Sequence, residues 1–341
     1  MASVKKPVTI LEAVKKFGWP EPGSKIISHE VLLGERCNAR CLFCCAKDMN
    51  KAAAWLPYGK LLAELDAARA RDAWLVTFSG GEATLYPHLE RAARAAKKAG
   101  FRSVQLLTNG FKLAEPAYAA RLAAAGFDEI KVSMHGVDSA THDRLVGVPG
   151  AYKKALKAVA NLNRLGVKAS FNFAVTRANY RQMPLFARFA GTELGLTGFC
   201  YMFSFYAGAM LEENNGLSVS YAEALPYLKH ALEYMALRKI TVESKMLSNF
   251  PPCAAPEYAN LMSDWGAASP EAGSRVSRGA RARLMPVFYS SRKVKPGSCR
   301  GCVNYACCYG VDAGYLDRYG SAEFRPLKKM PKKFPLVPLY P

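Results

Sequence analysis

Short runs of strand-forming residues alternate with longer helical stretches from residue 28 to about residue 240. The strand candidates are SHEVLLG (28–34), WLVTFS (74–79), SVQLLT (103–108), EIKVSM (129–134), KASFNFAV (168–175) and GFCYMFS (198–204). The stretches between them carry apolar residues at helical spacing. Alternation of this kind is typical of a parallel sheet built from βα units. The sequence therefore predicts an α/β fold with six such units.

Glycine marks the ends of the helical stretches. Four of them end in a glycine that is followed directly by an apolar residue, at Gly100, Gly126, Gly166 and Gly195. Glycine accepts the left-handed conformation that closes a helix and turns the chain back to the sheet. The pattern Ser220-x-x-Glu223 is a capping box, which predicts one more helix through about Arg238.

The strand–helix pattern stops near residue 245, where Pro, Gly, Arg and Cys become frequent. We therefore expect an N-terminal extension at 1–27, a domain of βα units at 28–240, a cysteine-rich extension at 245–325 and a basic, Pro-rich tail at 326–341. The sequence carries neither a signal peptide nor an apolar run long enough to span a membrane. This predicts a soluble, cytoplasmic protein with no membrane partner.

The charge is strongly basic and unevenly distributed. The chain has 47 Lys and Arg against 27 Asp and Glu, a net charge of +20, and residues 272–311 contain no acid. One interpretation is a solvated, partly disordered loop. The other is an electrostatic surface for an anionic partner, such as an acidic peptide, a phosphorylated metabolite or RNA.

Ten cysteines fall mostly into two groups that lie far apart in the chain. The first group is RCNARCLFCC at 36–45, and the second spans residues 299–308. In a long cytoplasmic chain, such groups indicate metal or redox chemistry rather than disulfides. The sequence therefore predicts two metal sites.

Polar and special residues collect just after the predicted strands. The first cysteine group follows strand one, and the next four strands are followed by SGGEATLYP, TNG, SMHG and VTRAN. In parallel α/β folds the carboxyl ends of the strands form the ligand-binding face. We therefore expect these five segments to converge on one mouth.

The array Cys37-x3-Cys41-x2-Cys44, with Phe43 before the third cysteine, resembles the radical S-adenosylmethionine (SAM) enzymes. The resemblance implies a partial (β/α)6 barrel and a [4Fe-4S] cluster held by three cysteines. Because a cubane normally takes four thiolates, three leave one iron open, and in the family that iron chelates SAM. The alternatives are a zinc site or a ferredoxin-type cluster with Cys45 as the fourth ligand.

The segment Ser79-Gly80-Gly81-Glu82 resembles the Gly-Gly-Glu motif on the family's second strand. Paired glycines let backbone approach a ligand closely, and the glutamate is expected to accept hydrogen bonds from the ammonium group of SAM. The family often has proline after the glutamate, whereas this chain has Ala83.

The resemblance implies further SAM contacts. Phe43 would lie against the adenine, Ser133 and Asn172 would contact the ribose or carboxylate, and Arg144 would pair with the carboxylate. Asn109 in TNG is expected to face the mouth. The alternative for the polar residues is a local turn or helix cap, and Arg144 fits a surface position equally well. His135 is interpreted as structural.

The second cysteine group, Cys299-x2-Cys302-x5-Cys308, resembles the auxiliary-cluster extension called SPASM and its shorter relative, the twitch subdomain. No cysteine follows Cys308, so we expect one auxiliary [4Fe-4S] cluster. Cys253 is expected to be its fourth ligand because related extensions take their first ligand well upstream, and Cys307 is excluded by the spacing. A zinc site on the same four thiolates is the alternative.

The sequence thus predicts an enzyme that cleaves SAM to a 5′-deoxyadenosyl radical and abstracts a substrate hydrogen atom. A flavodoxin- or ferredoxin-type protein is the expected electron donor. The preferred substrate is a ribosomally made peptide, although about 27 residues before strand one are too few for a peptide-recognition domain. The alternatives are a small polar metabolite (sugar, aminocyclitol or nucleotide) or, in another class, a non-catalytic iron–sulfur carrier or zinc-binding RNA module.

Cys200 is the one candidate for a catalytic side chain. Strand alternation places Cys200, Met202 and Ser204 on one face of strand six. If that face lines the barrel interior, Cys200 can return a hydrogen atom to a substrate radical. The alternative is a small apolar filler in the core.

Overall fold

The computed structural model describes residues 28–45, 54–196, 198–212, 216–240, 246–262, 275–278, 281–284, 293–305, 308, 310–329 and 334. The predicted N-terminal extension at 1–27, Cys307, parts of the basic segment at 272–311 and most of the tail lie outside the described residues.

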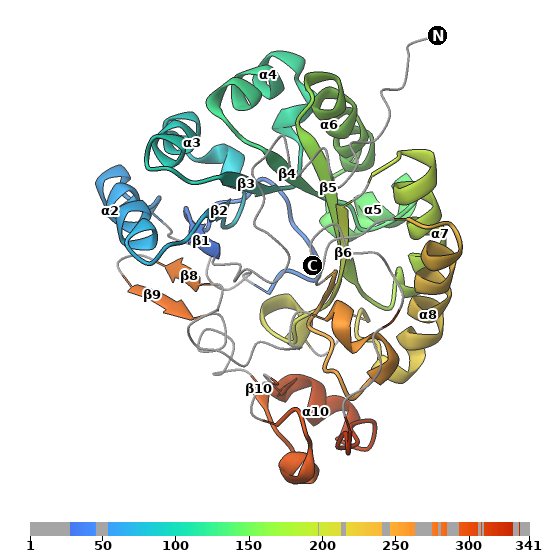
Figure 1. Cartoon of the computed structure of the whole chain (residues 1–341). Coiled ribbons are helices and arrows are strands. Elements are labelled where there is room, and N and C mark those ends of the chain that lie inside the picture. The colour runs from blue at the N-terminus through green and yellow to red at the C-terminus, as the bar shows by residue number, and fades with distance from the viewer. Residues whose placement is uncertain are drawn as a thin grey trace.

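A curved sheet of parallel strands forms the body of the protein (Figure 1). Its order is β7-β6-β5-β4-β3-β2-β1-β8-β9. The parallel strands β1 to β7 are Ser28–Leu32, Leu75–Ser79, Ser103–Thr108, Glu129–Ser133, Lys168–Val175, Gly198–Phe203 and Leu247–Ser248. All six predicted strands are present, and the α/β partial barrel is confirmed.

Helices cover the convex, outer face of this sheet (Figure 1). The α-helices of the barrel are α2 (Tyr58–Arg69), α3 (Leu89–Lys98), α4 (Pro116–Ala125), α5 (Ser139–Val146), α6 (Ala151–Leu165), α7 (Met183–Arg188) and α8 (Tyr221–Leu237). Short 3-10 turns are η2 (Ala83–Leu85), η3 (Lys112–Ala114), η4 (Tyr180–Gln182), η6 (Gly208–Leu211) and η7 (Pro256–Leu261), and η5 (Phe189–Glu193) is a π-helical turn. No helix among the described residues has both the length and the apolar character needed to cross a membrane.

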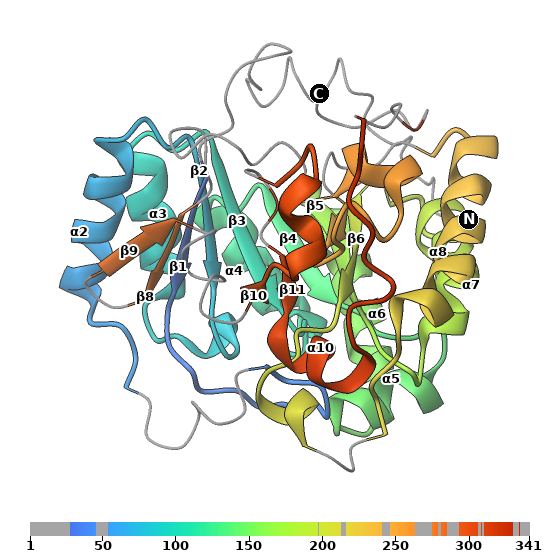
Figure 2. The ribbon, with the colours of Figure 1, turned by 90° about the horizontal axis from the view of Figure 1, so that it is seen from below.

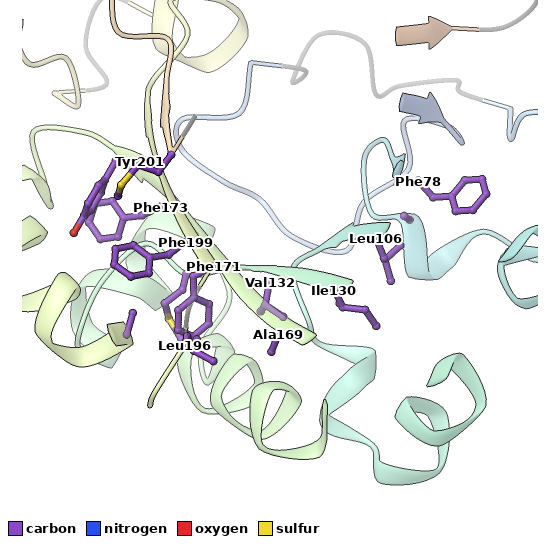
Figure 3. Close-up of a cluster of buried hydrophobic side chains, with 14 of the residues drawn as sticks. Phe78, Leu106, Ile130, Val132, Ala169, Phe171, Phe173, Leu196, Phe199 and Tyr201 are labelled. Carbon is purple, nitrogen blue, oxygen red and sulfur yellow. The ribbon is translucent and has the colours of Figure 1, made fainter. Parts of the chain in front are cut away.

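Aromatic side chains fill the layer between the sheet and these helices (Figure 3). Phe186 of α7 contacts the rings of four strand residues, with centroid distances of 4.6 to 6.0 Å, namely Phe171, Phe173, Phe199 and Tyr201. Because side chains alternate across a strand, Asn172 and Cys200 lie on the opposite, inner face. The residues that flank the helix-facing rings are thus the ones available to a site inside the barrel.

The predicted chain terminations are confirmed. All four predicted glycines have positive φ, from 62° at Gly195 to 102° at Gly126. Gly126 and Gly166 are the left-handed C-caps of α4 and α6. Ser220 and Glu223 form the expected capping box at the start of α8, which ends at Leu237.

A small C-terminal unit lies across the open side of the curved sheet, as the two views in Figures 1 and 2 agree. It contains β10 (Lys293–Val294), η8 (Gly297–Gly301), β11 (Val311–Asp312) and α10 (Ala313–Tyr319), and β10 pairs antiparallel with β11. Tyr315 of α10 is buried, and its hydroxyl accepts a hydrogen bond from the Tyr221 backbone N–H at 2.9 Å. The amide of Asn249 donates to Asp312 at 3.0 Å. The unit is therefore packed onto the barrel rather than tethered to it.

The sheet also contains strands that the sequence pattern does not predict. β7 has only two residues. β8 (Arg275–Arg278) pairs parallel with β1, and β9 (Arg281–Leu284) pairs antiparallel with β8. The start of the acid-free segment is thus part of the sheet, and it covers the edge that β1 would otherwise expose.

Candidate functional site

The loop at residues 36–45, here called the cluster loop, follows β1 and is held by backbone contacts. Arg40 and Leu42 donate N–H groups to the carbonyls of Val146 and Leu145 at the end of α5, both at 2.9 Å. On its other side, Ala209 donates to the Cys44 carbonyl at 3.0 Å. The loop has little secondary structure of its own, so neighbouring elements set its shape.

The three predicted cluster ligands lie near one another in this loop. Burial, together with the negative charges of Cys37 and Cys44, raises the pKa of Cys41 to about 12. Burial likewise raises the pKa of Cys37, and the negative charges of Glu82 and Cys44 raise it further. Charges interact strongly only at short range. The effects of the neighbouring cysteines on these two pKa values therefore indicate that the three thiols lie close together. The arrangement fits a cluster that neutralises three thiolates together.

The Gly80-Gly81 pair packs against the backbone that leads into the cluster loop. A Cβ on Gly81 would lie 2.4 Å from the carbonyl oxygens of both Glu35 and Arg36, and one on Gly80 would lie 2.3 Å from that of Gly34. The Gly81 N–H donates to Gly34 at 2.8 Å. We expected the glycines to admit a ligand, but in the structure the close approach is to the chain itself.

Glu82 is also engaged by its own chain. Its Oε1 accepts from the backbone N–H and hydroxyl of Thr84, at 3.0 and 2.6 Å, and from the hydroxyl of Thr108 at 2.5 Å. Its Oε2 accepts from the Asn109 N–H at 2.7 Å. The carboxylate is 1% exposed and joins the loops after β2 and β3. Each carboxylate oxygen has about two acceptor sites, and Oε2 accepts one hydrogen bond here, so it retains capacity for a further donor.

Asn109 links the loop after β3 to the cluster loop. Its side-chain amide donates to Oδ1 of Asn38 at 2.7 Å, and its own Oδ1 accepts from the Phe111 N–H at 3.0 Å. Asn38 stands directly after Cys37, so the contact ties the third strand to a predicted cluster ligand. The sequence analysis did not single out Asn38, whose position between two cysteines was the available signal.

Ser133, Asn172 and Cys200 form a row across three adjacent strands. Ser133 pairs in register with Asn172, and Asn172 pairs with Cys200. All three are partly exposed, while the alternating residues in β4 and β6 are buried. The structure thus brings two predicted SAM contacts beside the candidate hydrogen donor, on the inner face of the sheet.

Phe43 and His135 meet at the edge of the mouth. Their rings are 4.7 Å apart in an edge-to-face arrangement. His135 accepts the Ala174 N–H at Nδ1, at 3.0 Å, and burial together with His142 holds its pKa well below the ordinary value. His135 is therefore a neutral, structural side chain. Arg144 is exposed on α5, the helix whose last carbonyls hold the cluster loop.

Ser79 belongs to a polar layer further inside the barrel, which the sequence analysis missed. Its hydroxyl donates to Glu30 of β1 at 2.5 Å, and burial raises the pKa of Glu30. Beside it, Glu129 accepts from Gln105 at 2.9 Å and from Ser170 at 2.8 Å. Polar residues at alternate positions within otherwise apolar strands were the signal for this layer.

The four cysteines predicted for the second site line one cavity, here called the auxiliary site. Cys253 comes from the segment before η7, Cys299 from η8, and Cys302 and Cys308 from the turns that follow. Burial, together with the negative charges of the other three cysteines, raises the pKa of Cys253 to about 12. Among the described residues, no three His, Cys, Asp or Glu side chains are gathered in the way a single metal ion requires.

Comparison with known proteins identifies the barrel. Residues 31–190 match the model of the Radical SAM superfamily. The chain is 30% identical over 171 residues to a probable GTP 3′,8-cyclase of Saccharolobus islandicus, covering 50% of this chain and 53% of that one. It is also 30% identical over 176 residues to an Fe-coproporphyrin III synthase of Methanosarcina barkeri, covering 51% and 43%. The chain thus spans about half the length of the curated relatives it matches.

Solved structures share the fold over more of the chain. Streptococcus suis SuiB bound to precursor peptide SuiA has a TM-score of 0.64 at 16% identity, covering 93% of this chain and 78% of that one. Native anSMEcpe with bound AdoMet and Kp18Cys peptide has a TM-score of 0.57 at 14% identity, covering 89% and 93%. The family match, the three cysteines of the cluster loop and the partial barrel agree: the barrel region at residues 31–190 is a Radical SAM superfamily domain.

Proposed function

We propose that this enzyme cleaves SAM reductively and abstracts a hydrogen atom from a peptide substrate. The observation that carries the proposal is the C-terminal unit, which lies across the open side of the barrel (Figure 2) and contributes three of the four cysteines that line one cavity. Two solved proteins that share the fold over 93% and 89% of this chain have peptides bound. The relatives that act on a nucleotide or a porphyrin match only about half of the chain.

The three thiols of the cluster loop would hold a [4Fe-4S] cluster with one open iron. A reduced cluster there would supply the electron that cleaves bound SAM into methionine and a 5′-deoxyadenosyl radical. That radical would take a hydrogen atom from a substrate C–H bond, which gives 5′-deoxyadenosine and a carbon radical on the substrate. A flavodoxin- or ferredoxin-type protein would supply the electron. Oε2 of Glu82 is the acceptor left for the SAM ammonium, and Phe43, Asn109, Ser133, Asn172 and Arg144 are the further proposed contacts.

The substrate class is tested by coupled turnover. The reconstituted enzyme is reduced with dithionite in the presence of SAM and given either the short peptides encoded beside its gene or GTP. We expect 5′-deoxyadenosine to rise with a peptide and that peptide to change mass. Turnover coupled to GTP alone would instead support a nucleotide substrate, the candidate favoured by the identity to the GTP 3′,8-cyclase. An iron–sulfur carrier or RNA module would produce no 5′-deoxyadenosine.

We further propose that Cys253, Cys299, Cys302 and Cys308 hold one auxiliary [4Fe-4S] cluster. The four cysteines line one cavity, and a zinc ion on the same thiolates would draw all four sulfurs to about 2.3 Å from one centre. A cubane instead distributes its four thiolates over four irons.

Iron counting tests the auxiliary cluster. A triple variant with Cys37, Cys41 and Cys44 changed to alanine is expected to keep about four irons and lose about four, because one cubane remains. A further Cys308→Ala change should remove most of the remaining iron, while Cys307→Ala serves as the matched control and should not. A colourless, zinc-loaded triple variant would refute the cluster, and iron loss on changing Cys307 instead would refute the ligand choice.

Cys200 is proposed as a hydrogen-atom donor to the substrate radical, because its register places it beside Asn172 on the inner face. Its S–H bond would break as the product C–H bond forms, and one proton and one electron from the flavodoxin- or ferredoxin-type donor would return the thiyl radical to the thiol. Because a thiol exchanges its hydrogen with solvent, turnover in D2O should place deuterium in the product. Cys200→Ala is expected to keep SAM cleavage and lose the deuterium. Retained deuterium in this variant would leave Cys200 as a core filler.

A further inference from the structure

Asn304 lies in the turn between two cysteines of the auxiliary site and points its side chain inward. Its neighbours Val303 and Tyr305 are 46% and 43% exposed, whereas Asn304 is 3% exposed. Its carbonyl accepts the Cys308 N–H at 2.9 Å, and the Val303 N–H donates to Leu327 at 2.9 Å. The turn is thus fixed on both sides, and Asn304 lines the same cavity as the four cysteines.

The amide nitrogen of Asn304 has no hydrogen-bond acceptor among the described residues. Nδ2 is buried and has no hydrogen-bond partner among the described residues, and a buried donor left in this state destabilises the folded protein. The polar side chains that share the cavity include two cations, Lys295 and Arg325, which offer donors rather than acceptors. The remaining polar atoms of the described lining side chains are chiefly sulfurs, which accept hydrogen bonds when they are thiolates.

We propose that Asn304 donates a hydrogen bond from Nδ2 to a sulfur of the auxiliary cluster and thereby raises its reduction potential. This inference rests on the auxiliary cluster proposed above. Hydrogen bonds to cluster sulfurs favour the reduced, more negative state. One such bond is already made by the chain, since the Gly310 N–H donates to Sγ of Cys308 at 3.3 Å. Asn304 adds a second donor from inside the cavity, so it acts as a positioning and tuning residue.

Redox titration of the auxiliary cluster alone tests this role. In the Cys37/Cys41/Cys44 triple-alanine background, Asn304→Leu removes the donor while keeping a similar volume. We expect the ratio of reduced to oxidised cluster at a fixed potential, followed by electron paramagnetic resonance, to fall up to about tenfold, which is about 59 mV for one electron. Asn260→Leu is the matched control, because that amide donates to the carbonyl of Phe334 and lies outside the cavity lining. It should leave the ratio unchanged.

A second measurement needs no variant at Asn304. The triple-alanine protein is prepared with asparagine labelled with nitrogen-15 in the side chain only, reduced, and measured by electron–nuclear double resonance. Asn304 carries the one side-chain amide among the described residues that line the cavity, so a nitrogen-15 coupling supports the bond, and its absence refutes it even if Asn304→Leu fails to assemble a cluster. A brown protein whose potential is unchanged in Asn304→Leu overturns this inference and leaves the proposed function intact. A triple variant without iron overturns the auxiliary cluster itself, and this inference with it.

Discussion

Alanine at Cys37, Cys41 or Cys44 is expected to abolish 5′-deoxyadenosine formation from SAM. The three thiols lie near one another, because Cys37 and Cys44 raise the pKa of Cys41 and Cys44 raises the pKa of Cys37. A cubane that has only three protein ligands cannot be held reliably by two. The measurement is 5′-deoxyadenosine released under dithionite, together with iron content.

Cys45→Ala is the matched control for these three variants, since it removes a thiol from the next position of the same loop. It should leave SAM cleavage largely intact. If Cys45→Ala alone emptied the site, or if one of the other three variants cleaved SAM normally, the three-ligand assignment would be wrong.

Gly81→Ala is expected to lower SAM cleavage by about 100-fold or more, because displacing a reacting group by about 1 Å can have an effect of that size. The added methyl would lie 2.4 Å from the backbone oxygens of Glu35 and Arg36. Backbone cannot swing aside as a side chain can, so the loops after β1 and β2 must separate. Cys37 follows directly and would move with them.

Gly59→Ala provides the comparison, because a Cβ at Gly59 meets no atom within 4 Å. Iron content and SAM cleavage should match the parent there. Full iron loading and normal SAM cleavage in Gly81→Ala would contradict the proposed role of the close packing between Gly81 and the backbone of Glu35 and Arg36. The glycine pair would then be explained by the close approach of a ligand.

The sequence predicted the parts of the fold whose signals are local. Strand alternation, the glycine C-caps and the Ser220–Glu223 capping box depend on neighbouring residues, and all appear in the structure. The β8–β9 pair was not predictable, because its place beside β1 depends on a partner more than 200 residues away in the chain. Two-residue strands such as β7 likewise carry no periodicity.

The site was predicted in residue identity more than in role. Spacing alone selected cysteines that the structure gathers in two places. The spacing could not reveal that the Glu82 carboxylate joins the loops after β2 and β3, because its partners Thr108 and Asn109 come from another strand. Asn304 gave no sequence signal at all, since an asparagine in a turn is ordinary.

The packing of the C-terminal unit onto the barrel has a thermodynamic consequence. Tyr315, Val311 and Phe324 belong to the same continuous core cluster as the barrel strands, and Asn249 joins Phe203 of β6 to Asp312 of β11. The unit therefore has no separate core and cannot unfold without exposing barrel aromatic rings to water. Since a ligand that binds only the folded state stabilises whatever unfolds with its site, iron held in the C-terminal unit would raise the melting temperature of the whole enzyme.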